Sequence, residues 1–172
     1  ATNVIGFGED FGARVEHMKK IRNLQAHSLK HYGTGFTSFI AWPVQLETNT
    51  FGRRNRGQNK HVLGAGSSEY LRHLAISRLF LDNIEHIQAS WPTMGIAVAQ
   101  MALLAGADDA GSTMMEENVV SASGTTKLDA TETELQSSII RAGFKPRRRN
   151  SDYSRLDTTL LVPELDELVA PP

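Results

Sequence analysis

The sequence predicts an α/β fold, built from four strand–helix units. Two observations carry this prediction. Short apolar stretches of strand length alternate with longer segments whose apolar residues recur at helical spacing. Polar or aromatic residues follow the strand-like stretches directly. Alternation of this kind implies parallel strands joined by helical crossovers, and four units fit either an open doubly wound sheet or half of a (βα)8 barrel.

Composition narrows the class of protein further. The chain has 172 residues, of which 40% are apolar and 22% charged, as expected for one globular domain. Its net charge of −1 gives no general attraction to nucleic acid or anionic membranes, and no apolar run approaches the length of a membrane span. Cysteine is absent, which excludes disulfides, thiol nucleophiles and cysteine-held iron–sulfur clusters within this chain. Because the chain begins at alanine, we expect a processed protein or a fragment.

The first unit is a strand over residues 2–6, a glycine-rich turn and a helix over residues 10–29. Asp10 is expected to cap that helix, and Gly33 to end it. Its apolar face is predicted from residues spaced by three and four: Phe11, Val15, Met18 and Ile21.

The second unit begins with a strand over residues 36–42, ended by Pro43. Residues 44–67 show little periodicity and are expected to form a long, basic, exposed loop. A helix follows over residues 68–82, with Ser67 as its N-cap. Its buried stripe is predicted to consist of Leu71, Leu74, Ala75 and Leu79.

The third and fourth units complete the alternation. A strand over residues 87–91 precedes a helix from Pro92 to about Ala105. Residues 111–122 are expected to form the fourth strand, and Thr131 with Glu134 forms a capping box for the last helix. The half-barrel domain is predicted over residues 1–153, followed by an acidic and apolar tail over residues 154–172.

Several side chains at the predicted strand ends are candidates for binding or catalysis. Gly6 and Glu9 stand where a helix N-terminus can approach an anionic ligand, although a simple turn followed by a helix-favouring acid is the more common explanation of this pattern. The others are aromatic, amide, hydroxyl and carboxylate groups that suit a ring and a ribose, or a solvated strand end: Trp42, Gln45, Asn49, Gln88, Ser90, Glu116, Glu117 and Asn118. No metal site is expected, because the six histidines are assigned to surface or packing roles. The arginines at 147–149 are interpreted as a solvated segment.

Five stretches of the chain together resemble a known family. They are residues 35–43, 78–84, 87–91, 111–122 and 141–146. In these stretches, and more loosely over residues 2–153, the chain is similar to cyclic dehypoxanthinyl futalosine synthase. Aminofutalosine synthase and the deazaflavin-forming FO synthases share the layout, but the Met-Glu-Glu-Asn-Val-Val-Ser block favours the cyclase.

The resemblance implies the C-terminal half of a TIM-like barrel, strands five to eight of a radical S-adenosylmethionine (SAM) enzyme. It implies an oxidoreductase of menaquinone biosynthesis, cytoplasmic by family, which uses S-adenosylmethionine and a [4Fe–4S] cluster. By position, Gly6 and Glu9 would lie near the cofactor, and Glu116 or Glu117 would be catalytic. Gln45, Asn49, Gln88, Ser90 and Asn118 would face the substrate, with Trp42 beside them.

This sequence departs from the family pattern in three respects. It has no cysteine, so it cannot hold the cluster. Phe7 stands where the family commonly has histidine, and the loop after Phe51 is longer and more basic. We therefore expect another protein chain to complete or cover the half barrel. Three functions remain open: half of a split enzyme, a catalytically inactive accessory subunit of a larger complex, or a small-molecule binding module.

Overall fold

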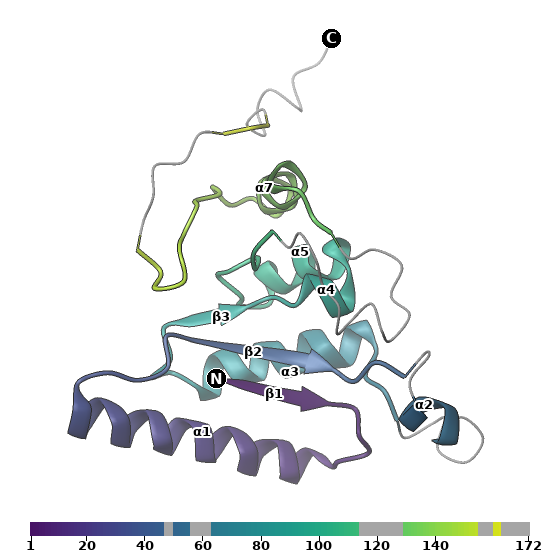
Figure 1. Cartoon of the computed structure of the whole chain (residues 1–172), viewed down its shortest axis with the longest axis vertical. Helices are drawn as coiled ribbons and strands as arrows, with labels where there is room; N and C mark the ends of the chain where they lie inside the picture. Colours follow the sequence, from purple (N-terminus) through teal and green to yellow (C-terminus); the bar gives the residue numbers. More distant parts are fainter. Residues whose placement is uncertain (47–49, 56–62, 114–128, 155–159, 163–172) are drawn as a thin grey trace.

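The computed structural model describes residues 1–46, 50–55, 63–113, 129–154 and 160–162 (Figure 1). Strands and helices alternate along the chain as the sequence predicts. In order, they are β1 (Thr2–Ile5), α1 (Phe11–Tyr32), β2 (Ser38–Pro43), α2 (Thr50–Asn55), α3 (Ser67–Phe80), β3 (His86–Gln88), α4 (Trp91–Met94), α5 (Ile96–Leu104) and α7 (Glu132–Arg141).

The three strands form a parallel sheet in the order β1-β2-β3. A fourth chain segment begins beside β3, where Asp109 forms a parallel bridge with Gln88. The backbone N–H of Ala89 donates to the carbonyl of Asp109 at 2.8 Å, and that of Asp108 donates to the carbonyl of Ile87 at 3.1 Å. The predicted alternation of parallel strands is thus confirmed for three units. Most of the expected fourth strand, residues 114–122, lies outside the described residues.

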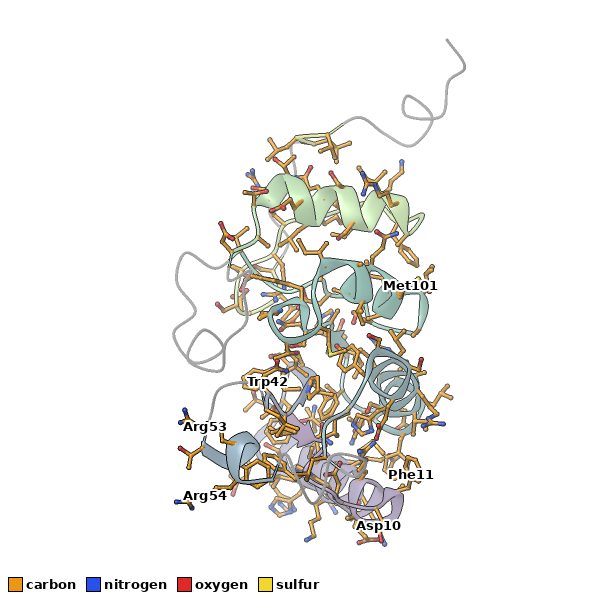
Figure 2. All side chains as sticks on the ribbon, turned by 90° about the vertical axis from the view of Figure 1, so that its right-hand side faces the viewer. Asp10, Phe11, Trp42, Arg53, Arg54 and Met101 are labelled. Carbon is orange, nitrogen blue, oxygen red and sulfur yellow. The ribbon has the colours of Figure 1, made fainter. Side chains whose placement is uncertain are left out.

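The two faces of the sheet differ in their surroundings. One face carries buried residues, among them Ile5, Phe39 and Ile87, and it packs against the helices. The opposite face carries Val4, which is 40% exposed, and Trp42, which is 43% exposed. Figure 2, seen from the ends of the strands, shows Trp42 on the side away from α3 and α5. The described part of the chain therefore forms a sheet with helices on one face only, as part of a (βα) barrel would.

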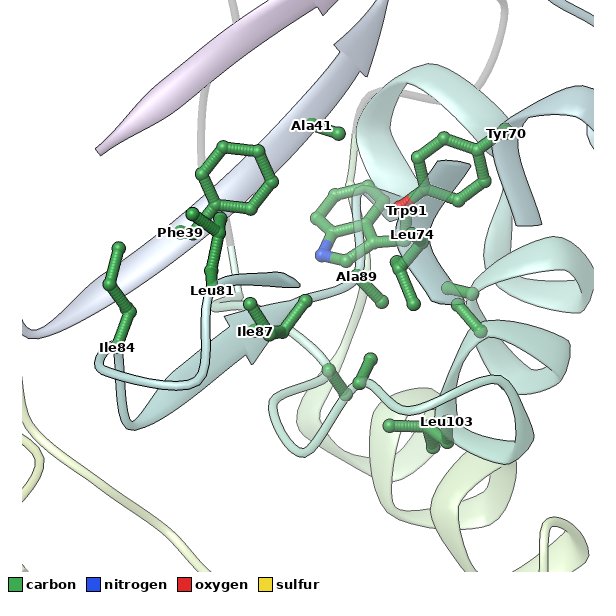
Figure 3. Close-up of a cluster of buried hydrophobic side chains, with 14 of the residues drawn as sticks. Phe39, Ala41, Tyr70, Leu74, Leu81, Ile84, Ile87, Ala89, Trp91 and Leu103 are labelled. Atoms are coloured by element: carbon green, nitrogen blue, oxygen red, sulfur yellow. The ribbon is translucent and has the colours of Figure 1, made fainter. Parts of the chain in front are cut away.

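The core joins the covered face of the sheet to α3 and α5. Figure 3 shows Phe39, Ile87 and Trp91 converging from β2, β3 and the start of α4. Tyr70 of α3 is fully buried, and its hydroxyl accepts a hydrogen bond from the backbone N–H of Ser90 at 2.8 Å. Burial raises the pKa of Tyr70 to about 12, so the phenol stays protonated and the core holds no phenolate.

The first helix confirms Asp10 as its N-cap and Gly33 as the residue that ends it. Asp10 caps it by accepting a hydrogen bond from Ala13 N–H at 2.7 Å, and Gly33 ends it in the left-handed region with φ 69°. The helix reaches Tyr32, three residues beyond the expected end. The predicted apolar face is partly wrong, because Phe11 is 63% exposed while Arg14 and Gln25 are buried. Hydrogen-bonded polar side chains occupy positions that apolar periodicity would assign to apolar residues.

The N-cap and the buried face of α3 also differ from those predicted. Gly66 is the N-cap, and the proposed cap Ser67 is already the first helical residue. Leu79 is 82% exposed, so its predicted place in the buried stripe is wrong. The buried residues are Tyr70, His73, Leu74 and Ser77. Ser77 is accommodated because its hydroxyl donates to the carbonyl of His73 at 2.8 Å.

Three further predictions need correction, while one at the last helix is confirmed. The predicted strand over residues 87–91 ends at Gln88, and Trp91 already belongs to α4. Gly95, with φ 81°, separates α4 from α5, where one helix was expected. Residues 44–67 contain the short helix α2 and are not wholly a loop. The capping box of Thr131 and Glu134 is present at the start of α7.

No helix in the described ranges is long and apolar enough to cross a membrane.

Candidate functional site at the strand ends

Gly6 and Trp42 lie toward the carboxyl ends of β1 and β2, whereas Gln88, the last residue of the short strand β3, is level with Ile40 of β2 and Thr2 of β1. Val4 lies opposite Trp42 in the register of β1 and β2, and Ile40 lies opposite Gln88 in that of β2 and β3. Because side chains alternate along a strand, the side chains of Val4, Ile40, Trp42 and Gln88 lie on the face of the sheet that the helices leave uncovered. This face, which we call the open face, offers an aromatic ring, aliphatic groups and an amide to a ligand.

The turn after β1 is held by the carboxylate of Glu9. Its two oxygens accept hydrogen bonds from the backbone N–H of Gly6 at 2.9 Å and of Phe7 at 2.7 Å. Partial burial acts to raise the pKa of Glu9, but the hydrogen bonds from Gly6 N–H and from Arg14 outweigh it, so the pKa lies below the ordinary value. These two N–H groups are therefore already bonded within the chain. A cofactor role for Gly6 and Glu9 stays a prediction, and any ligand would have to meet other atoms of the turn.

Arg14 connects this turn to the helices behind the sheet. Its side chain is only 7% exposed, and it forms ion pairs with Glu9 and with Glu69 of α3, each at 2.6 Å. Its Nη1 is buried and has no hydrogen-bond partner among the described residues. Burial, followed by the nearby charge of Arg14, lowers the pKa of His73 to about 4, so this histidine is neutral at pH 7. The neutral ring lies 3.2 Å from the side-chain amide of Asn3 on β1.

The chain between β2 and α3 packs against the end of β1. The carbonyl of Gly6 accepts a hydrogen bond from Gly64 N–H at 2.7 Å. Gly6 has φ 97°, and a Cβ atom there would lie 2.8 Å from the carbonyl carbon of Gly64, so only glycine fits. Phe7 packs edge-on against Phe51 of α2, with ring centroids 5.5 Å apart. The loop that the sequence marks as unusually long is thus fastened to the turn after β1.

Gln45 and Gln88 differ in how far the chain already satisfies them. The Gln45 amide donates to the carbonyl of Pro43 at 3.0 Å, so it helps to shape the chain after β2. Gln88 is half-buried, and its side chain has no hydrogen-bond partner within the described part of the chain. Gly111 packs closely against it, since a Cβ atom there would lie 3.3 Å from Nε2 of Gln88. Gln88 therefore has unused hydrogen-bonding capacity beside the start of the fourth segment.

The structure does not bring Ser90 to the open face. Its side chain is 1% exposed, and its hydroxyl is hydrogen-bonded to that of Thr93 at 2.7 Å. The cause is the early end of β3, because the alternation that would turn Ser90 inward stops at Gln88. The remaining predicted site residues lie outside the described residues: Asn49, Glu116, Glu117 and Asn118.

A buried cluster that the sequence analysis missed lies where the strands begin. Asp109 is 7% exposed and accepts hydrogen bonds from Arg149 at 2.6 Å and from the Tyr153 hydroxyl at 2.5 Å. The Tyr153 ring stacks on His86 at 3.9 Å between centroids. The interpretation of residues 147–149 as a solvated basic segment is therefore wrong for Arg149, and Arg148 pairs with Glu132 at 2.6 Å. Nothing in the local pattern identifies Asp109 as the partner, because it lies 40 residues away.

Comparison with known proteins identifies relatives over most of the chain. Residues 33–161 match the family model described as the CofH/MqnC C-terminal region. Cyclic dehypoxanthine futalosine synthase of Halalkalibacterium halodurans is 44% identical over 159 residues, which cover 92% of this chain and 39% of the relative. The enzyme of the same name from Streptomyces coelicolor is 40% identical, covering 91% of this chain and 36% of the relative.

A more distant relative carries a different name. The 5-amino-6-(D-ribitylamino)uracil–L-tyrosine 4-hydroxyphenyl transferase of Methanoculleus marisnigri is 33% identical, covering 91% of this chain and 40% of the relative. The chain thus spans between 36% and 40% of the length of these three relatives.

Proposed function

Since this chain belongs to the CofH/MqnC C-terminal region family, we propose that it forms the substrate-facing C-terminal half of a radical SAM barrel. The reaction would be the cyclisation of dehypoxanthinyl futalosine in menaquinone biosynthesis. The observation that carries the proposal is the open face, because a parallel sheet covered by helices on one side only leaves uncovered the face that lines a barrel interior, at whose carboxyl end ligands bind. The higher identity to the two cyclic dehypoxanthine futalosine synthases than to the transferase favours the cyclase.

The residues of this chain do not fit the iron–sulfur cluster that the family implies. Such clusters are held by cysteine thiolates, and the chain has no cysteine. Radical formation therefore belongs to a cysteine-bearing half, supplied by another chain or by the rest of a longer polypeptide. A cytoplasmic location follows only from the family and stays part of the proposal.

This chain's own residues would bind and orient the substrate. The Trp42 indole, 43% exposed, offers a face on which a planar ring can stack. Gln88 offers amide donors and an acceptor toward the same face. The turn at Gly6 and Glu9, held by Arg14, would form the wall on the other side. A carboxylate among Glu116 and Glu117 would handle a proton, and Asn118 would contact the substrate, as the resemblance implies.

A second candidate is a catalytically inactive accessory subunit of a larger complex. The Phe7–Phe51 contact favours it, because an aromatic pair closes the end of β1 where the family commonly places a histidine. A binding module that retains the nucleoside pocket is the third possibility. All three share the open face and differ in whether a cysteine-bearing half joins it and in whether the joined pair turns over substrate.

The decisive experiment is anaerobic reconstitution with the cysteine-bearing N-terminal half of the Halalkalibacterium halodurans enzyme. We expect cyclised product from the reconstituted pair, and at least about tenfold less when Trp42→Ala or Gln88→Ala is used, since each removes a substrate contact. Leu79→Ala is the matched control, because Leu79 is 82% exposed on the helical side. A stable, iron-loaded pair without turnover would favour the accessory subunit instead. Retained nucleoside binding by the chain alone would favour the binding module.

A further inference from the structure

Two histidines of α1 lie on one exposed face of the helix, one turn apart. His27 and His31 are separated by four residues, and their ring centroids lie 4.3 Å apart. Both side chains are exposed. Tyr32 lies beside both rings, at 6.3 Å and 6.5 Å between centroids. The prediction that the six histidines show no paired metal spacing is therefore wrong for His27 and His31.

This spacing suits the binding of a metal ion by two imidazoles. Histidines at positions i and i+4 of a helix present their nitrogens to a common point, as in helical zinc motifs. Imidazole is a good ligand for Zn²⁺ and Cu²⁺, and in a chain without cysteine it is the strongest neutral donor available. The rings are tilted by 38°, and exposed side chains can change rotamer at low cost to point both nitrogens at one ion.

The last turns of α1 provide a rigid base for the two rings. The buried Gln25 side chain donates to the carbonyls of Phe36 and Asn83 and accepts from Phe36 N–H at 2.6 Å. Ser28 donates to the carbonyl of Thr34 at 2.6 Å, which fixes the exit of the helix. A site on a helix held in this way loses little freedom when it binds an ion.

The histidine pair lies far from the open face along the fold. Because α1 runs antiparallel to the strands, its last turn lies at the edge where the strands begin, as Figure 1 shows. Trp42 and the turn at Gly6 lie toward the opposite edge, and α1 packs on the other face of the sheet from Gln88. The pair is therefore separate from the proposed function and does not depend on it.

We propose that His27 and His31 form a two-histidine site for a divalent transition-metal ion, Zn²⁺ or Cu²⁺. Within the described ranges, no group of three or more histidine, aspartate or glutamate residues lies close enough together to hold a metal. The protein thus supplies two ligands, and water fills the remaining positions.

The test is calorimetric titration of the purified protein with Zn²⁺ and with Cu²⁺, each ion alone. We expect one ion per chain at this site, with affinity at least about tenfold weaker in His27→Ala and in His31→Ala, since the second imidazole acts at high effective concentration. The difference in metal affinity between the parent and each variant separates binding at this site from binding at any other site on the protein.

Two controls keep the proposal falsifiable. His31→Ala combined with Tyr32→His preserves the number of histidines but moves one of them off the shared face, so it should bind as weakly as His31→Ala. His17→Ala removes a histidine elsewhere on α1 and should bind like the parent. Equal affinity of parent and His27→Ala, or full affinity of the combined variant, would overturn the proposal.

Discussion

Arg14 is the residue that ties the turn after β1 to the rest of the molecule. It is 7% exposed and lies between Glu9 and Glu69, with both ion pairs at 2.6 Å. Replacing it with an apolar residue would leave two partly buried carboxylates without their cation. The sequence alone does not reveal this role, because arginine in an amphipathic helix is ordinarily exposed and carries no local sign of burial.

Arg14→Met is expected to destabilise the protein by about 2–4 kcal/mol, because one partner of a buried ion pair is lost while the other remains. Urea unfolding at pH 7 measures the change in the free energy of unfolding. Lys19→Met is the matched control. It breaks a pair between side chains that are 58% and 61% exposed, and it should change stability by less than about 1 kcal/mol. Similar losses in both variants would contradict the assignment.

His73 predicts a loss of stability on mild acidification. Burial, and then Arg14, lowers its folded-state pKa to about 4, below the ordinary value of 6.5. The unfolded chain therefore binds a proton at higher pH than the folded one does. The stabilising contribution of the neutral His73 is present above pH 6.5 and is lost as the pH falls toward about 4.

The expected size of this loss is at most about 3 kcal/mol, from the difference between the two pKa values. Unfolding curves between pH 7 and pH 4 should fall more steeply for the parent than for His73→Gln, which cannot titrate. Parallel curves for the two proteins would show that His73 does not cause the pH dependence.

At the scale of elements, the segment after α7 is fastened across the start of the sheet. Asp109, beside β3, holds Arg149 and Tyr153 of this segment. Tyr153 in turn stacks on His86, the first residue of β3. The capping box of α7 was predictable from four consecutive residues. The contacts of Asp109 with Arg149 and Tyr153 were not predictable, because these residues are far apart in sequence and meet only once the strands are aligned.

Asp109→Asn is expected to destabilise the protein by about 2–4 kcal/mol, because the half-buried Arg149 guanidinium loses its counter-charge. Thermal unfolding together with limited trypsin cleavage after Arg147 measures both the stability and the attachment of the segment. Asp129→Asn, at an exposed aspartate, is the control and should stay within about 0.5 kcal/mol of the parent. Unchanged cleavage in Asp109→Asn would show that this carboxylate does not hold the segment.

At the scale of the whole molecule, much of the fold was predictable from the sequence. The positions of β1, α1, β2 and α7 follow from period and capping signals. The early end of β3, the break at Gly95 and the burial of Arg14 and Gln25 depend on tertiary contacts that no local pattern encodes. Of the predicted site residues, Trp42 and Gln88 share the open face, whereas Ser90 is buried behind it because β3 ends at Gln88.

The central claim is that the open face is covered by a cysteine-bearing half barrel, and Trp42 can report on it. The chain has two tryptophans, of which Trp42 is 43% exposed and Trp91 is 2% exposed. We therefore measure tryptophan fluorescence while adding the N-terminal half of the Halalkalibacterium halodurans enzyme. The account predicts a blue shift in the parent as Trp42 leaves water, and none in Trp42→Phe. An unchanged parent spectrum, with both folded halves present at saturating concentration, would contradict it.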